Sequence, residues 1–238
     1  MSRTNTKSTT FWARLRRLVF WSIGTLLTLT VVVMLLFRWL PPPTSTFMVQ
    51  ERLSGKKIDY RWVPMSRISP YAALAVIASE DQNFFNHWGV DLKAVADAIE
   101  DNRTRESPRG ASTISQQVVK NLFLWPGRSY VRKAFEVYFT VVMELVWPKK
   151  RILEVYLNVA EMGKGVFGVE AASRRFFHQP AADLNRRQSA TLAAVLPNPK
   201  QMLARKPSAY VSRRTWQIVE QMTALGGTRF LEQGLHNT

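Results

Sequence analysis

The residues best suited to chemistry lie in ASEDQNFFNHWGVD, positions 78–91, where an apolar run ends in two adjacent carboxylates, Glu80 and Asp81. If the preceding residues are helical, the neighbours of Glu80 one and two turns back are apolar. Such surroundings raise the pKa of a carboxyl group, which suits it to proton transfer near neutral pH. A salt-bridge partner at a helix end is the plainer interpretation of Glu80. Asp81 and His87 could serve only to brace the turn by hydrogen bonds.

A second polar group occupies the segment GASTISQQVVKN. Ser112 and Thr113 can cap a helix, and Thr113 and Gln116 have the spacing of a capping box. Gln116, Gln117 and Lys120 would then share one polar face. Two amides and an ammonium group beside a helix N-terminus suit an oxyanion such as a phosphate, although a plain solvated face has the same pattern.

The third group is the stripe of charges in RSYVRKAFEVYF, positions 128–139. Arg128, Arg132 and Glu136 are spaced four apart, with Lys133 beside them. A ladder of helical ion pairs would explain the spacing and would contribute a few tenths of a kcal/mol per pair. In the functional interpretation, two guanidinium groups and an ammonium group surround a pyrophosphate, and Glu136 orients them or holds a cation.

The fourth group lies in KRILEVYLNVAEMGKGVFGVEAASRRFF, positions 150–177. Its apolar positions are interpreted as core residues: Ile152, Leu153, Val155, Tyr156 and Val159. Glu154 and Asn158 lie four apart, so they form a polar edge that could anchor a turn or line a cleft.

These groups must be positioned by helices, because the pattern from residue 69 onward is helical. Ser69 is a candidate N-cap and is followed by proline at the first helical position. The polar, proline-containing segment 102–110 predicts a mobile loop. We find no repeat and no strand–helix alternation, so the fold class is mainly α. The predicted helices span about 70–81, 91–101, 113–123, 128–146, 149–162, 168–177, 185–196 and 208–225.

An uncharged apolar run at residues 18–37 precedes this domain. About 20 apolar residues in a helix cover the hydrocarbon core of a bilayer, and no signal-peptidase pattern follows. We therefore expect a basic cytoplasmic tail at 1–17, a transmembrane anchor at 18–40, a linker and lead-in at 41–68 and a soluble domain at 69–238. The tail carries five basic residues and no acid, so the N-terminus should remain cytoplasmic.

The net charge of the 238-residue chain is +16, and +11 remains on residues 18–238 without the five charges of the tail. A basic domain on the far side of a membrane indicates either contact with anionic lipid headgroups or a polyanionic substrate. A nucleic-acid ligand would fit the positive charge, but it would not fit a domain that is exported across the membrane. The absence of cysteine excludes disulfides and metal–thiolate sites, and three histidines without ligand spacing argue against a zinc enzyme.

Together, the four groups closely resemble the motifs of the bacterial peptidoglycan glycosyltransferases, in their single-domain, membrane-anchored form, the monofunctional transglycosylases. The motifs occur in family order over about residues 70–200. The matching positions are Glu80, Asp81, Phe84, His87 and Gly89; Gly110 to Asn121; Arg132, Lys133 and Glu136; and Ile152 to Asn158, then Gly163, Gly165, Gly168, Ala171 and Ala172. Two positions depart from the family, Gln188 for an acidic residue and Phe176 for a tyrosine.

The resemblance implies a lysozyme-like helical domain, with a membrane-embedded jaw, that polymerises lipid II and releases undecaprenyl pyrophosphate. Glu80 would be the general base on the acceptor 4-hydroxyl, in an inverting reaction, and Glu136 the second catalytic carboxylate. The loop 102–110 would cover the cleft. The substrate-binding residues would be Asp81, Ser112, Thr113, Gln116, Gln117, Lys120, Asn121, Arg128, Arg132 and Lys133.

No cofactor is required by this resemblance, and a divalent cation, Mg²⁺ or Mn²⁺, could assist at the pyrophosphate without a dedicated metal site. The expected partners are lipid II, the growing glycan chain, the bilayer and other cell-wall synthesis proteins. The expected location is the bacterial inner membrane, crossed once, with the catalytic domain in the periplasm.

Two other functions remain open at this point. A lytic transglycosylase or lysozyme-like hydrolase also uses a glutamate in a helical cleft, but it has no need of a cationic stripe such as 128–136. A non-catalytic scaffold of the cell-wall machinery would not require Glu80.

Overall fold

In the computed structural model, the described residues are 6–101, 110–127 and 129–237. Arg128 and nearly all of the predicted loop 102–110 lie outside them. The chain divides into two compact units, Met1–Leu40 and Pro41–Thr238. The first contains α1 (Thr6–Trp39), within which Trp12–Trp39 is long and apolar enough to cross a membrane.

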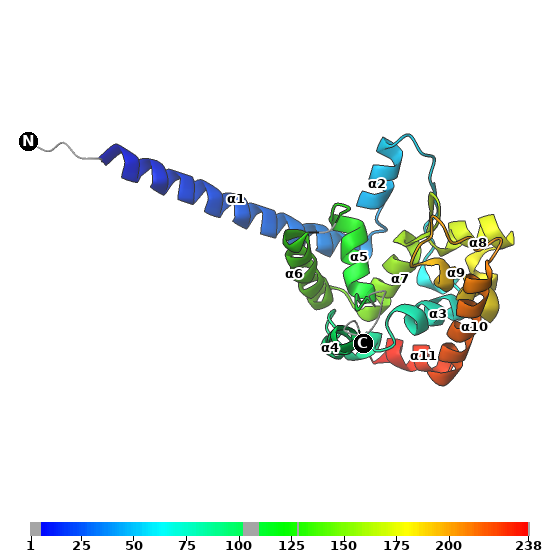
Figure 1. Ribbon diagram of the computed structural model, residues 1–238. Coiled ribbons are helices and arrows are strands. Elements are labelled where there is room, and N and C mark those ends of the chain that lie inside the picture. The colour runs from blue at the N-terminus through cyan, green and yellow to red at the C-terminus, as the bar shows by residue number, and fades with distance from the viewer. Residues whose placement is uncertain (1–5, 102–109, 128, 238) are drawn as a thin grey trace, which may run out of the picture. The chain divides into compact units, whose positions relative to one another are not determined.

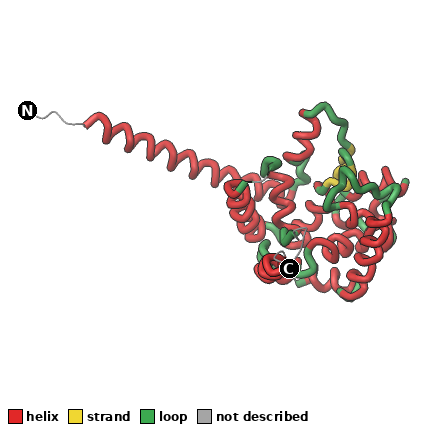
Figure 2. The backbone as a smooth tube through the Cα atoms, in the orientation of Figure 1, coloured by secondary structure: helices red, strands yellow, loops and turns green. Residues whose placement is uncertain are grey.

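The second unit is built mainly of helices (Figures 1 and 2). The helices are α2 (Thr46–Leu53), α3 (Pro70–Glu80), α4 (Leu92–Asp101), α5 (Ile114–Phe123), α6 (Tyr130–Val146), α7 (Lys149–Val159), α8 (Val169–Phe177), α9 (Arg186–Val195), α10 (Ala209–Ala224) and α11 (Thr228–His236). The strands are β1 (Asp59–Tyr60), β2 (Glu161–Gly163) and β3 (Val166–Phe167). The predicted fold class, mainly α, is confirmed.

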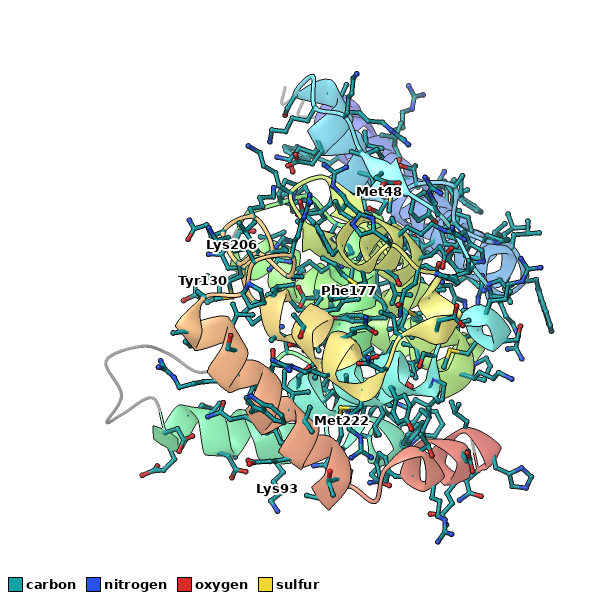
Figure 3. The ribbon with its side chains drawn as sticks, turned by 90° about the vertical axis from the view of Figure 1, so that its right-hand side faces the viewer. Met48, Lys93, Tyr130, Phe177, Lys206 and Met222 are labelled. Atoms are coloured by element: carbon teal, nitrogen blue, oxygen red, sulfur yellow. The ribbon has the colours of Figure 1, made fainter. Side chains whose placement is uncertain are left out.

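The centre of the domain is α3, in which every residue from Ala72 to Ala78 is buried. A helix that is apolar all round belongs in a protein interior. It packs against α9, α10 and α11. Figure 3 shows α9 and α10 side by side in this half of the domain, where Met222 of α10 is buried. This packing fixes α3 and leaves its last residue, Glu80, at the edge of the core.

A second group of helices forms around α5, which packs against α2, α6 and α7. The hydroxyl of Thr46 in α2 donates to the backbone oxygens of Asn121 and Leu124, at 2.9 and 2.7 Å. The stretch predicted as a linker and lead-in, 41–68, therefore contributes a helix to the same compact unit. It also contributes a strand, because β1 pairs in parallel with β3.

The sheet is small, with strand order β1–β3–β2, and β2 pairs antiparallel with β3. The helix predicted to reach residue 162 ends at Val159, because the following residues form β2. Gly168 closes the turn with φ +83°, and a Cβ there would lie 2.4 Å from the backbone oxygen of Asn158. Only glycine fits so close to another backbone.

The polar edge of α7 anchors a loop. The side chain of Asn158 accepts from the backbone N–H of Val63 and donates to its oxygen, both at 2.9 Å. Glu154 accepts from the backbone N–H of Met65 at 2.8 Å. Of the two roles predicted for this edge, anchoring a turn is the one the structure shows.

Candidate active site

Glu80 is the last residue of α3 and is half-buried. Burial raises the pKa of its carboxyl group above the usual 4.5. A hydrogen bond from Gln117 and the charges of Arg214 and Lys120 act in the opposite direction, and Asp81 adds to the rise. The predicted cause, a carboxylate kept partly from water by apolar neighbours, is therefore present.

The α5 helix brings Gln117 and Lys120 to Glu80. Gln117 Nε2 donates to Glu80 Oε2 at 2.8 Å. Burial lowers the pKa of Lys120, the negative charges of Glu136 and Glu80 raise it, and the positive charges of Arg132 and Lys133 lower it again. Lys120 is thus close enough for its pKa to be shifted both by Glu80 and by the charges of α6. The carboxylate group of positions 78–91 and the charged stripe of positions 128–139 therefore belong to one site.

The charges of α6 form a compact cluster. Glu136 is buried, and its two oxygens accept from Arg132 Nη1 at 2.7 Å and from Lys133 Nζ at 2.5 Å. Arg132 Nε is buried and donates to no acceptor among the described residues. Arg128, the fourth member predicted for this stripe, lies outside the described residues.

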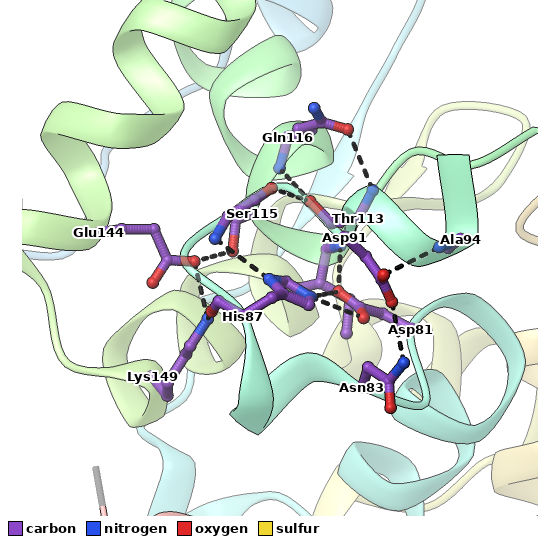
Figure 4. Close-up of polar contacts among 12 residues, drawn as sticks. Asp81, Asn83, His87, Asp91, Ala94, Thr113, Ser115, Gln116, Glu144 and Lys149 are labelled. Carbon is purple, nitrogen blue, oxygen red and sulfur yellow. Dashed lines mark hydrogen bonds and ion pairs between the residues drawn. The ribbon is translucent and has the colours of Figure 1, made fainter. Parts of the chain in front are cut away.

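Asp81 connects the end of α3 to the start of α5 (Figure 4). Its carboxylate accepts from His87 Nε2 at 2.9 and 3.1 Å and from the backbone N–H of Ile114 at 3.0 Å. His87 Nδ1 accepts from the backbone N–H of Gly89 at 3.1 Å. These contacts occupy both oxygens of Asp81, which fits the bracing role that the sequence left open for it.

Thr113 and Gln116 are engaged in the predicted capping box of α5. Thr113 Oγ1 accepts from the backbone N–H of Gln116, and Gln116 Oε1 accepts from that of Thr113, both at 3.2 Å. Thr113 Oγ1 also donates to the backbone oxygen of Gly89 at 2.6 Å. Both side chains are buried, so this helix start is fixed on the segment that follows Glu80.

A buried ion pair completes this support (Figure 4). Glu144 Oε1 accepts from Ser115 Oγ at 2.5 Å and from Lys149 Nζ at 2.8 Å. Lys149 Nζ also donates to the backbone oxygen of His87 at 2.6 Å and lies 4.7 Å from the ring centre of Phe84. This pair could not be predicted from sequence spacing, because Glu144 and Lys149 lie on different helices, five residues apart.

The remaining predicted residues lie near the site with less specific contacts. Ser112 is exposed and lines a pocket of about 280 Å³ together with Glu80 and Asp81. Asn121 is half-buried on α5. A residue that the sequence missed is Arg214 of α10, whose Nη2 donates to the backbone oxygen of Ser79 at 3.3 Å. It is distant in the chain and belongs to none of the motifs.

A dedicated site for a divalent cation would need several ligating side chains close together. Among the described residues, no three histidine, cysteine, aspartate or glutamate side chains come together as metal ligands. Glu136 was predicted either to orient the neighbouring cations or to hold a metal cation, and its oxygens accept from Arg132 and Lys133. We therefore derive no catalytic step through a metal.

Comparison with known proteins identifies the family to which this site belongs. The family model described as Transglycosylase matches residues 47–223. The Biosynthetic peptidoglycan transglycosylase of Ectopseudomonas mendocina (strain ymp) is 47% identical over 226 residues, covering 92% of each chain. That of Pseudomonas putida (strain W619) is 50% identical over 226 residues, covering 92% of this chain and 94% of its own. That of Pseudomonas syringae pv. syringae (strain B728a) is 50% identical over 215 residues, covering 88% and 91%.

The similarity therefore extends over nearly the whole chain and includes all four groups of site residues. The resemblance that the motifs indicated is confirmed: the chain belongs to the transglycosylase family.

Proposed function

We propose that the protein polymerises lipid II into glycan strands, with release of undecaprenyl pyrophosphate. Glu80 takes the proton of the acceptor 4-hydroxyl as that oxygen attacks the donor anomeric carbon. The new bond forms between the anomeric carbon and the 4-oxygen, and the bond from that carbon to the pyrophosphate breaks. Attack opposite the leaving group inverts the anomeric configuration.

The observation that carries this proposal is the position of Lys120. It lies one helical turn from Gln117, which donates to Glu80, on a helix that packs against α6, and the charges of Glu80 and of Arg132, Lys133 and Glu136 all shift its pKa. Lys120 therefore lies close both to the proposed base for the attacking hydroxyl and to the proposed cations for the leaving pyrophosphate. Preorganised cations stabilise the charge that develops on such a leaving group.

We assign the leaving pyrophosphate to Lys120, Arg132 and Lys133, and to Arg128 as the sequence predicts. Glu136 accepts from both Arg132 and Lys133, so it holds these two cations in fixed positions. Arg132 Nε is buried and has no acceptor within the described part of the chain. A hydrolase acting on a neutral glycosidic bond would have no use for this cluster.

We further propose that the protein is anchored in the inner membrane, with the N-terminus in the cytoplasm and the domain in the periplasm. Trp12–Trp39 supplies a helix of sufficient length and hydropathy. On α6, Val131, Phe135, Val141 and Leu145 are exposed and share one face, opposite the buried Glu136 and Thr140. An exposed apolar face of this kind fits contact with lipid, which also carries the proposed substrate.

Incubation of the detergent-solubilised chain with labelled lipid II tests the function. The wild type should form polymer, and Glu80→Gln should lose at least about a hundredfold in rate, because general acid–base catalysis typically contributes that much or more. The control is Glu220→Gln, an exposed glutamate on α10, which should polymerise at the wild-type rate.

Three results would contradict the proposal. Polymer at the wild-type rate from Glu80→Gln would exclude this base. Failure of the folded wild type to form polymer would exclude the reaction. Cleavage of preformed glycan strands without polymerisation would favour the lytic alternative.

A further inference from the structure

Tyr156 on α7 is one of the most buried large side chains of the domain, with 1% of its surface exposed. The sequence pattern treats it as a core residue. Its hydroxyl group nevertheless has a defined partner, since Tyr156 Oη donates to Gln117 Oε1 at 3.1 Å. The phenol therefore contacts the residue that contacts Glu80.

The Gln117 side chain lies between the two groups. Its Nε2 donates to Glu80 Oε2 at 2.8 Å, while its Oε1 accepts from Tyr156. An amide has one donating and one accepting end, so the hydrogen atom of the phenol decides which end faces Glu80. With Tyr156 donating, the NH₂ end faces the carboxylate.

The charged groups that face Glu80 come from several elements. Lys120 from α5 and Arg214 from α10 favour the carboxylate, and the adjacent Asp81 opposes it. Burial, with the charges of Glu80 and Asp81, raises the pKa of Tyr156 well above its usual 10. Tyr156 thus stays protonated at any pH at which the enzyme would work, and its hydroxyl can always donate.

We propose that Tyr156 is a positioning residue for the general base, which allows Gln117 to serve Glu80 in both of its protonation states. This inference rests on the proposed function. Before the reaction, the phenol donates to Gln117 Oε1, and Gln117 Nε2 donates to the carboxylate. After Glu80 has taken the acceptor proton, its new O–H donates to Gln117 Oε1, and Gln117 Nε2 donates to Tyr156 Oη.

The exchange requires only that the amide turns over and the phenol O–H rotates. The proton from the acceptor stays on Glu80, and no bond to hydrogen in Gln117 or Tyr156 is broken. A hydroxyl group can fill both roles because it is at once a donor and an acceptor. Phenylalanine cannot, so Gln117 Oε1 would lose its partner in the state in which Gln117 Nε2 donates to the carboxylate.

Tyr156→Phe in the full-length, detergent-solubilised chain tests this role on labelled lipid II. We expect kcat to fall roughly 5- to 100-fold with KM nearly unchanged, the range expected for one unpaired polar group. The acidic limb of the pH–rate profile should move to higher pH, because the Gln117 hydrogen bond lowers the pKa of Glu80 and would no longer be held in place.

Coupling to Gln117 separates positioning from a general loss of packing. In the Gln117→Leu background, Tyr156→Phe should have little further effect on kcat or on the acidic limb, because both changes remove the same interaction. Tyr60→Phe is the matched control, since its phenol donates to the backbone oxygen of Pro42 at 2.7 Å, away from Glu80. It should leave the pH profile unchanged.

A wild-type kcat and acidic limb in folded Tyr156→Phe would overturn the inference, as would additive effects with Gln117→Leu. If Tyr156→Phe fails to fold, the Gln117→Leu variant provides the test. An acidic limb of its pH–rate profile at the wild-type position would show that the amide does not act on Glu80, and would overturn the inference. Failure of the proposed function is recognised separately, by a wild type that makes no polymer or a Glu80→Gln variant that still does.

Discussion

At the scale of single residues, the environment of Glu80 suits the proposed base catalysis at the expense of stability. Burial raises the pKa of its carboxyl group, and the cations of Lys120 and Arg214 offset only part of that effect. Protein active sites commonly hold such groups, because the perturbation that makes a useful base also disfavours its charged form in the folded state.

Glu80→Gln should therefore stabilise the protein at neutral pH, because the variant has no charge to bury there. In the wild type, the folded-state pKa of Glu80 lies above its unfolded value of about 4.5, so stability declines as the pH rises from there through the folded-state pKa. The variant lacks this decline. Melting temperatures of both proteins between pH 4 and 8 should diverge as the pH increases.

The exposed Glu220→Gln should leave the melting temperature unchanged across this range. A Glu80→Gln variant that is less stable than the wild type at neutral pH would mean that the carboxylate is held favourably, against the direction of the pKa shift.

Residue types and spacing predicted which side chains could carry out chemistry, but not how polar groups are shared among them. The grouping of Glu80, Lys120 and the α6 cluster was expected from the motifs. The hydrogen-bond acceptors of Tyr156 and Arg214 could not be predicted, because these residues are brought to the site from α7 and α10 by the tertiary fold. A tyrosine within an apolar pattern looks like a core residue, and Tyr156 is one as well.

At the scale of elements, the segment between α3 and α4 depends on close contact with α6. Gly89 has φ +79°, and a Cβ there would lie 2.4 Å from Thr140 Cγ2 and 3.0 Å from Glu144 Cγ. Thr113 donates to the oxygen of the same glycine. The turn that follows Glu80 is thus held between the start of α5 and the inner face of α6.

Gly89→Ala should destabilise the domain by about 2–4 kcal/mol, because it adds the cost of a left-handed backbone to that of overpacking. Gly55→Ala is a matched control: it has φ +72° and nothing within 4 Å of its Cβ position, so it should lose only about 1–2 kcal/mol. Denaturant unfolding of the two variants measures the difference.

Thr140→Ser provides the rescue, because it removes Cγ2 and keeps the hydroxyl that donates to the backbone oxygen of Glu136. Gly89→Ala combined with Thr140→Ser should be more stable than additivity of the two changes predicts. Equal losses for Gly89→Ala and Gly55→Ala would show that the close approach to α6 has no energetic consequence.

Elements with strong local signals were predictable, and short ones were not. Proline after Ser69 and the capping box led by Thr113 marked two helix starts correctly. The strands of two or three residues are too short for any periodicity to appear, so the sheet was missed. The helical, lysozyme-like domain that the resemblance implied is confirmed by the family match.

At the scale of the whole molecule, three features support the proposed contact with a membrane. They are the apolar helix Trp12–Trp39, the exposed apolar face of α6 and the net charge of +16. An anionic membrane surface attracts a basic protein, and an anchor keeps the domain near a substrate that diffuses in the bilayer. The basic tail of residues 1–17 sets the proposed orientation.

Single-cysteine variants test that orientation directly, since the natural chain contains no cysteine and gives no background labelling. A membrane-impermeant maleimide added to intact spheroplasts should label Asn237→Cys, an exposed position near the C-terminus, and should leave Ser8→Cys unlabelled. After lysis, both variants should react, which controls for the accessibility of each thiol.

Labelling of Ser8→Cys in intact spheroplasts would place the N-terminus outside, where the five basic residues of the tail would disfavour it. Protection of both thiols until lysis would place the domain on the cytoplasmic side and remove it from the site of glycan assembly.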